Sequence, residues 1–104
     1  MKAYIVNYTG HNFDGIYKLY PTAEIVTLSE GNVGIFNTHR LVYDFKLKMV
    51  DSGPEDVVVL TGSIILNIIA SLVMFERHGH VNVLIWLAKR QEYVPRSIGG
   101  EDLT

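Results

Sequence analysis

The chain contains no cysteine, which excludes disulfide bonds, thiolate zinc sites and a cysteine nucleophile. Charge is also sparse, because charged residues make up 19% of the chain and the formal net charge is -2. This balance argues against a protein whose main task is to neutralise the phosphates of nucleic acid. Neither the GxGxxG nor the Walker phosphate-binding pattern occurs, so no standard nucleotide fingerprint is present.

The longest stretch without a charge, residues 57–75, approaches the roughly 20 residues that a helix needs to cross a bilayer. Thr61-Gly62-Ser63 interrupts it, and Asn67 and Ser71 follow. We therefore predict a strand, a turn and a buried helix here, with no membrane segment. A chain without cysteine also fits a reducing compartment, and we expect the cytoplasm.

The length of 104 residues and the 48% of hydrophobic residues are typical of one domain with its own core. We assign residues 1–98 to this domain. Residues 99–104, with the sequence GGEDLT, are expected to form a flexible tail.

Hydrophobic periodicity predicts most of the secondary structure. Strands are expected at 2–8, 56–60 and 81–87, with an edge strand at 92–96 that ends near Pro95. Turn chemistry at residues 29–32 predicts a hairpin between segments 24–28 and 33–36. Helices are expected at 14–20, with Asp14 as a possible cap, and from a capping Ser63 to about His78.

Residues 37–50 fit two templates, because the apolar side chains match both a helix face and an alternating strand. We choose a helix, since Asn37 or Thr38 supplies an N-cap, and Gly53 and Pro54 supply a stop. The predicted fold is then α/β, a small three-layer Rossmann-like sandwich with a short, mostly parallel sheet. If residues 41–50 form a strand instead, the alternative is an α+β fold with a mixed sheet.

The candidate ligand site consists of two glycine-containing loops that follow the first and the central strand. Parallel strands would bring both loops to the carboxyl edge of the sheet, where helix N-termini favour an anion. We expect Gly62 to need a positive φ or a close backbone approach, and Asn67 to bind either ligand or backbone. The predicted binding residues are Thr9, Gly10, His11, Asn12, Thr61, Gly62, Ser63 and Asn67.

No other pattern predicts catalysis or metal binding. His78 and His80 lack a carboxylate at ligand spacing, so they are read as a helix C-terminus and not as a metal site. No catalytic triad or pair of acids can be assembled, so binding is favoured over an enzymatic role. The sequence identifies no cofactor.

The segments DVVVLTGS and GHVNVLIW, together with Asn67 and the EYV hairpin, resemble small α/β proteins of unassigned function carried by bacteriophages. The resemblance implies an accessory role in the infected bacterial cytoplasm. It supplies no catalytic residue.

Two functions are therefore weighed. The first is non-catalytic binding of a phosphorylated or nucleotide-like small molecule at the carboxyl edge of the sheet. The alternative is a protein interaction module, such as an inhibitor or a virion component, with no small-molecule ligand. A homo-oligomer is also expected, because the predicted helix from Ser63 is apolar on most sides, including Ile64, Ile68, Leu72 and Phe75.

Overall fold

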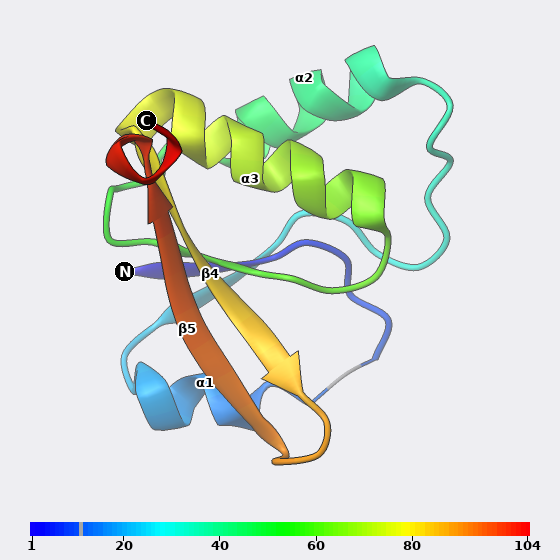
Figure 1. Cartoon of the computed structure of the whole chain (residues 1–104). Helices are drawn as coiled ribbons and strands as arrows, with labels where there is room; N and C mark the ends of the chain where they lie inside the picture. Colours follow the sequence, from blue (N-terminus) through cyan, green and yellow to red (C-terminus); the bar gives the residue numbers. More distant parts are fainter. Residues whose placement is uncertain (11) are drawn as a thin grey trace.

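A five-stranded sheet lies between two layers of helices (Figure 1). The computed structural model describes residues 1–10 and 12–104. The strands are β1 (Lys2–Ile5), β2 (Glu24–Thr27), β3 (Val57–Val59), β4 (His80–Leu87) and β5 (Glu92–Gly99). The helices are α1 (Asp14–Leu19), α2 (Thr38–Lys48) and α3 (Ile64–His78), followed by the short 3-10 helix η1 (Gly100–Leu103).

The strand order is β2-β1-β3-β4-β5. All neighbouring strands are parallel except β4 and β5, which form an antiparallel hairpin. The chain is thus a small α/β protein with a mostly parallel sheet, as predicted, and β5 makes that sheet mixed.

Alternation along the strands divides the core into two layers. Ala3 and Ile5 of β1 face α1 and pack with its Ile16. Tyr4 and Val6 point to the other face and pack against α2 and α3. The valines of β3 alternate in the same way, and all three are buried. A continuous run of valines is therefore explained by a central strand that is covered on both faces.

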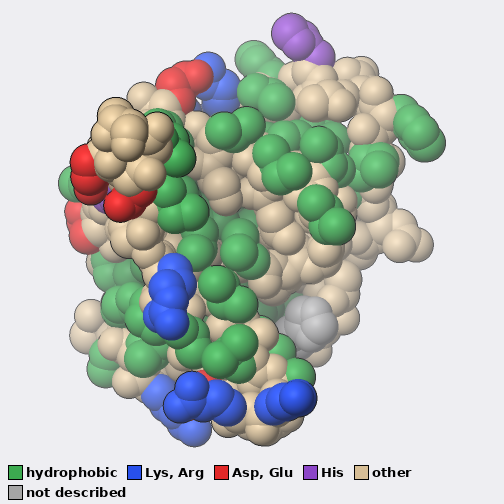
Figure 2. Space-filling view, in the orientation of Figure 1, with side chains coloured by type: hydrophobic (Ala, Val, Ile, Leu, Met, Phe, Trp, Pro, Cys, Tyr) green, Lys and Arg blue, Asp and Glu red, His purple; other side chains and the backbone are tan. Residues whose placement is uncertain are grey.

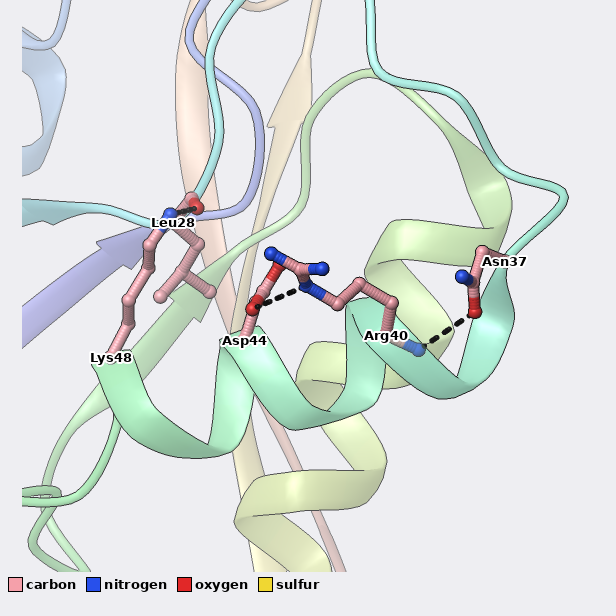
Figure 3. A network of polar contacts seen from close by, with 5 residues as sticks. All are labelled: Leu28, Asn37, Arg40, Asp44 and Lys48. Atoms are coloured by element: carbon pink, nitrogen blue, oxygen red, sulfur yellow. Dashed lines mark hydrogen bonds and ion pairs between the residues drawn. The ribbon is translucent and has the colours of Figure 1, made fainter.

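Residues 37–50 contain α2, so the prediction of a helix is confirmed and the strand alternative is wrong. The Asn37 side chain accepts a hydrogen bond from the backbone N–H of Arg40 at 3.1 Å (Figure 3). At the other end of α2, Lys48 Nζ donates to the carbonyl oxygen of Leu28 at 2.6 Å. The face that α2 turns to the core consists of Leu41, Phe45 and, at its C-cap, Met49.

The predicted hairpin between segments 24–28 and 33–36 is wrong. β2 pairs in parallel with β1, and the chain after β2 continues along the extension of β1. There the N–H of Tyr8 donates to Ser29 O at 2.8 Å, and the N–H of Gly31 donates to Tyr8 O at 2.9 Å. Because these bonds carry the chain forward, it does not fold back on β2.

The C-terminal segment is more regular than predicted. β5 continues past Pro95 to Gly99. A proline is compatible with an edge strand, because its nitrogen can face away from the sheet, where no hydrogen bond between strands is lost. Residues 99–104, expected as a tail, contain the end of β5 and η1. The N–H of Gly100 donates to the carbonyl oxygen of Gly79 at 3.0 Å, which ties η1 to the end of α3.

α3 ends at Gly79, whose φ of 74° fits the predicted glycine stop. α1 begins differently from the prediction, because Asp14 is its first residue and not its cap. Within residues 1–10 and 12–104, every helix is too short or too polar to cross a membrane.

Tyr4 provides a test of the core. Its hydroxyl is buried and has no hydrogen-bond partner among the described residues. Burial, together with the nearby Asp56 carboxylate, raises the pKa of Tyr4 to about 12. Because the folded state holds this proton more tightly than the unfolded state, its contribution to stability is complete below pH 10 and is lost as the pH rises towards 12.

We therefore expect Tyr4→Phe to leave the free energy of unfolding at pH 7 unchanged or to raise it by up to about 1 kcal/mol. The variant should also lose less stability than the wild type above pH 10. Urea unfolding followed by circular dichroism at pH 7 and pH 11 measures both effects. A loss of more than about 1 kcal/mol at pH 7 would show that the hydroxyl has a stabilising partner.

Candidate functional site

The two predicted loops lie at the same edge of the sheet. β1 and β3 are parallel neighbours, with Ala3 opposite Val57 and Ile5 opposite Val59. The segments that follow them, from residue 6 and from residue 60, therefore both leave at the carboxyl edge, as the site prediction requires.

A buried residue that the sequence analysis did not single out, Asn7, joins these segments. Its backbone N–H donates to Thr61 Oγ1 at 2.9 Å, and the Thr61 hydroxyl lies 2.9 Å from the Asn7 carbonyl oxygen. The Asn7 side-chain amide donates to Gly31 O at 3.0 Å, and its Oδ1 accepts from the Ser29 hydroxyl at 2.9 Å. Asn7 thus connects the segments after β2, through its side chain, and after β3, through its backbone.

Asn67 extends this network from α3. Its Oδ1 accepts a hydrogen bond from the backbone N–H of Thr61 at 3.1 Å. Of the two roles predicted for Asn67, the structure therefore shows the hydrogen bond to the backbone. Ser63 is the N-cap residue of α3, but its side chain makes no capping hydrogen bond, and the expected capping by its hydroxyl is wrong. The turn before α3 is instead held by the hydrogen bonds of Asn67 and Thr61.

Gly62 meets both conditions expected of it. Its φ is 69°, and a Cβ built at this position would lie 3.0 Å from both Cβ and Nδ2 of Asn7. A side chain here would therefore be strained by the backbone conformation and would press on the buried amide.

The described residues of the first loop lie at the surface. Thr9 and Gly10 are exposed, and Gly10 has a φ of 93°. The Asn12 side chain accepts the N–H of Asp14 at 2.7 Å and so holds the entry to α1. His11, also predicted, lies outside the described residues.

A cleft of about 540 Å³ opens at this edge on the α1 side of the sheet. Of the predicted site residues, Asn12 and Thr61 line it. The remaining wall comes from α1, from the end of β3 and from the β4–β5 hairpin. These lining residues are Asp14, Gly15, Lys18, Leu60, Trp86, Gln91 and Tyr93.

The hairpin gives the cleft an aromatic wall. Trp86 and Tyr93 are opposite each other in the β4–β5 register, and their rings pack edge to face with centroids 4.9 Å apart. Tyr93 is buried, which raises the pKa of its hydroxyl. Trp86 remains 42% exposed and offers its ring to the cleft.

The sequence analysis missed this wall. It assigned residues 81–87 and 92–96 to strands and gave neither Trp86 nor the turn between these strands a place in the site. Because β4 is parallel to β3, the turn at residues 88–91 lies at the carboxyl edge as well. The sequence feature that could have indicated this wall is the pair Trp86 and Tyr93, which lie on either side of the four-residue turn.

His78 and His80, near the opposite edge of the sheet, contact the segment that precedes β3. Ser52 Oγ lies 3.0 Å from His78 Nε2, and His80 Nε2 lies 2.7 Å from the carbonyl oxygen of Pro54. Both contacts hold the segment before β3. The described residues contain no group of three potential metal-ligating side chains.

Gly62→Val tests the turn after β3. We expect it to lower the free energy of unfolding by about 2 kcal/mol or more, because the left-handed backbone and the contact with Asn7 both oppose a side chain. Gly31→Val is a matched control, since Gly31 has a φ of 62° but open space where its Cβ would lie. Equal losses in urea unfolding would show that the approach to Asn7 contributes nothing.

One protein-family model matches the chain over residues 4–99, and its description is phage Pam3 gp32-like protein. No curated protein and no solved structure matches. The matched segment includes all five strands except the first two residues of β1, and all three α-helices. This agrees with the resemblance to small phage proteins of unassigned function. The chain belongs to the phage Pam3 gp32-like protein family.

Proposed function

We propose that this phage protein is a non-catalytic binder of a phosphorylated or nucleotide-like small molecule at the carboxyl edge of its sheet. The observation that carries the proposal is the cleft, which combines an exposed tryptophan ring with a lysine. The proposed location is the cytoplasm of the infected bacterium, where such a ligand would be available.

The topology supports a Rossmann-like arrangement, with the cleft beside the point where the strand order reverses. From β1 the chain passes through α1 to β2 on one side, and it then returns through α2 to β3 on the other side of β1. α1 lies on one face of the sheet, and α2 and α3 lie on the other (Figure 1). Open α/β sheets bind ligands beyond the strand ends at such a reversal of strand order.

The chemistry of the cleft supports a planar anion. Its volume of about 540 Å³ is within the range of small-molecule sites. Trp86 offers a face on which a base would stack, and the ammonium group of Lys18 would attract a phosphate. In this proposal Lys18 supplies the positive charge that the sequence analysis assigned to a helix N-terminus.

The alternative function, a protein interaction module, is supported by a different surface. The outer side of α3 exposes Ile64, Ile68 and Leu72, which favours the expected homo-oligomer. This surface lies on the α3 side of the sheet and the cleft on the α1 side, so the two functions are compatible in one chain.

The only tryptophan in the sequence, Trp86, makes the ligand proposal directly testable. We expect ADP to quench its fluorescence saturably and to raise the melting temperature. Lys18→Ala should weaken ADP binding by about tenfold, the effect of losing one charge-assisted hydrogen bond.

Lys46→Ala is the matched control, because Lys46 is an exposed lysine on α2, on the other side of the sheet, where it pairs with Glu76 at 3.3 Å. It should bind ADP like the wild type. Separate titrations with inorganic phosphate and with adenosine show how much of the affinity for ADP comes from the phosphate groups and how much from the nucleoside. If neither nucleotides nor these fragments change fluorescence or melting temperature, the interaction module becomes the better explanation.

A further inference from the structure

The β4–β5 hairpin leaves part of the sheet uncovered on the α3 side. In the register, Val94 lies opposite Ile85, and Ile98 lies opposite Val81. Val81 packs in the core beneath α3, so all four side chains point to that face. α3 packs mainly on β4, and Ile98 of β5 remains 46% exposed.

The outer side of α3 exposes further apolar side chains on the same side of the sheet. Ile64, Ile68 and Leu72 are spaced four residues apart, so they form one ridge along the helix. Ile68 is 47% exposed and Leu72 is 62% exposed. Figure 2 shows hydrophobic side chains gathered over α3 and over the hairpin on one face of the molecule. We call this surface the apolar band and define it as Ile64, Ile68, Leu72, Ile85, Val94 and Ile98. Arg96, opposite Val83, is exposed on the same face between Val94 and Ile98, and its guanidinium group donates to the carbonyl oxygen of Pro95 at 2.7 Å.

The band has the shape of a step, because a helix with its side chains stands roughly 10 Å above the sheet on which it packs. The ridge of α3 is the high part, and the uncovered strands β4 and β5 are the low part. A step of this kind is self-complementary: about a two-fold axis, the ridge of each copy would lie on the uncovered strands of the other.

The open edge of β5 is a poor alternative contact. The carbonyl oxygen of Leu84 accepts the N–H of Leu60, so the polar backbone groups of Leu84 point towards β3. Its partner in the register is Pro95, whose backbone nitrogen therefore faces the open edge and has no hydrogen to donate. Proline in the middle of an edge opposes the addition of another strand. The sheet face is therefore favoured over its edge.

We propose that the apolar band is the interface of a two-fold homodimer, in which α3 of each copy covers the β4–β5 face of the other. The band exposes on the order of 600 Å² of apolar side chain, the upper end for patches on monomers. With a polar rim it would reach the roughly 800 Å² that each partner contributes to a standard interface. The inference rests on the proposed self-association and is independent of the ligand cleft.

Sedimentation velocity of the unaltered chain over a range of concentrations tests the dimer without any substitution. The expected result is a particle of twice the 11.7 kDa chain mass at micromolar concentration. A chain that stays monomeric at all concentrations would overturn the proposal and leave the band for a different protein. The Trp86 titration with ADP is unaffected by this outcome, so the two proposals fail separately.

Two variants on different elements locate the interface. Ile68→Lys on α3 and Ile98→Lys on β5 should each raise the dissociation constant about tenfold or more, because each would bury an unpaired charge. Both side chains are already partly exposed in the monomer, so the fold should tolerate the change, and far-ultraviolet circular dichroism checks this.

Leu19→Lys is the matched control, since Leu19 is 41% exposed on α1 at the other face of the sheet. Its dimer should be as stable as that of the wild type. Leu47→Lys, on the outer side of α2, tests the boundary of the band. A dimer that Leu47→Lys dissociates and Ile98→Lys does not would place the interface on α2 and overturn the proposed surface.

Discussion

The hydrogen bonds of one buried residue, Asn7, hold the carboxyl edge of this sheet together. Four parallel strands end there, and the segments that follow β1, β2 and β3 would otherwise present unpaired backbone groups. Asn7 reaches Gly31 and Ser29 beyond β2, and its backbone shares two hydrogen bonds with Thr61 beyond β3. Gly62 must then pass close to the Asn7 side chain, which explains why a glycine occupies this turn.

This network also limits the free space at the carboxyl edge of the sheet. The segments after β1 and β3, where open α/β folds usually place their ligands, are joined by hydrogen bonds among Asn7, Thr61 and Asn67. The free space lies beside them, on the α1 side, between α1 and the β4–β5 hairpin. Thr61 belongs to both regions, because it holds the turn and lines the cleft. The turn residues therefore position the cleft and contribute little of its surface.

The β4–β5 hairpin gives the two faces of the sheet different properties. Because successive side chains of a strand point to opposite faces, Trp86 and Tyr93 form the wall of the cleft on the α1 side. Ile85 and Val94, their neighbours in sequence, lie on the α3 side and form part of the apolar band. A crossover helix at this position would cover the band and would separate the two aromatic residues. The tight turn instead brings them together and leaves the α3 side of β5 open.

The sequence by itself determined the local structure wherever one periodic pattern and one stop signal agreed. The valine run, the helix before Gly79 and the helix capped by Asn37 are of this kind, because their hydrogen bonds and burial depend on near neighbours. The site prediction assumed that β1 and β3 are parallel neighbours, and the structure pairs them in this way, which brings both loops to the same edge. Tertiary structure decided which residues meet there. Residues 29–31 follow β1 instead of turning back, and Trp86 faces a cleft, because strand order and register bring together segments more than twenty residues apart. No local pattern encodes such contacts, since their free energy exists only once the whole sheet has formed.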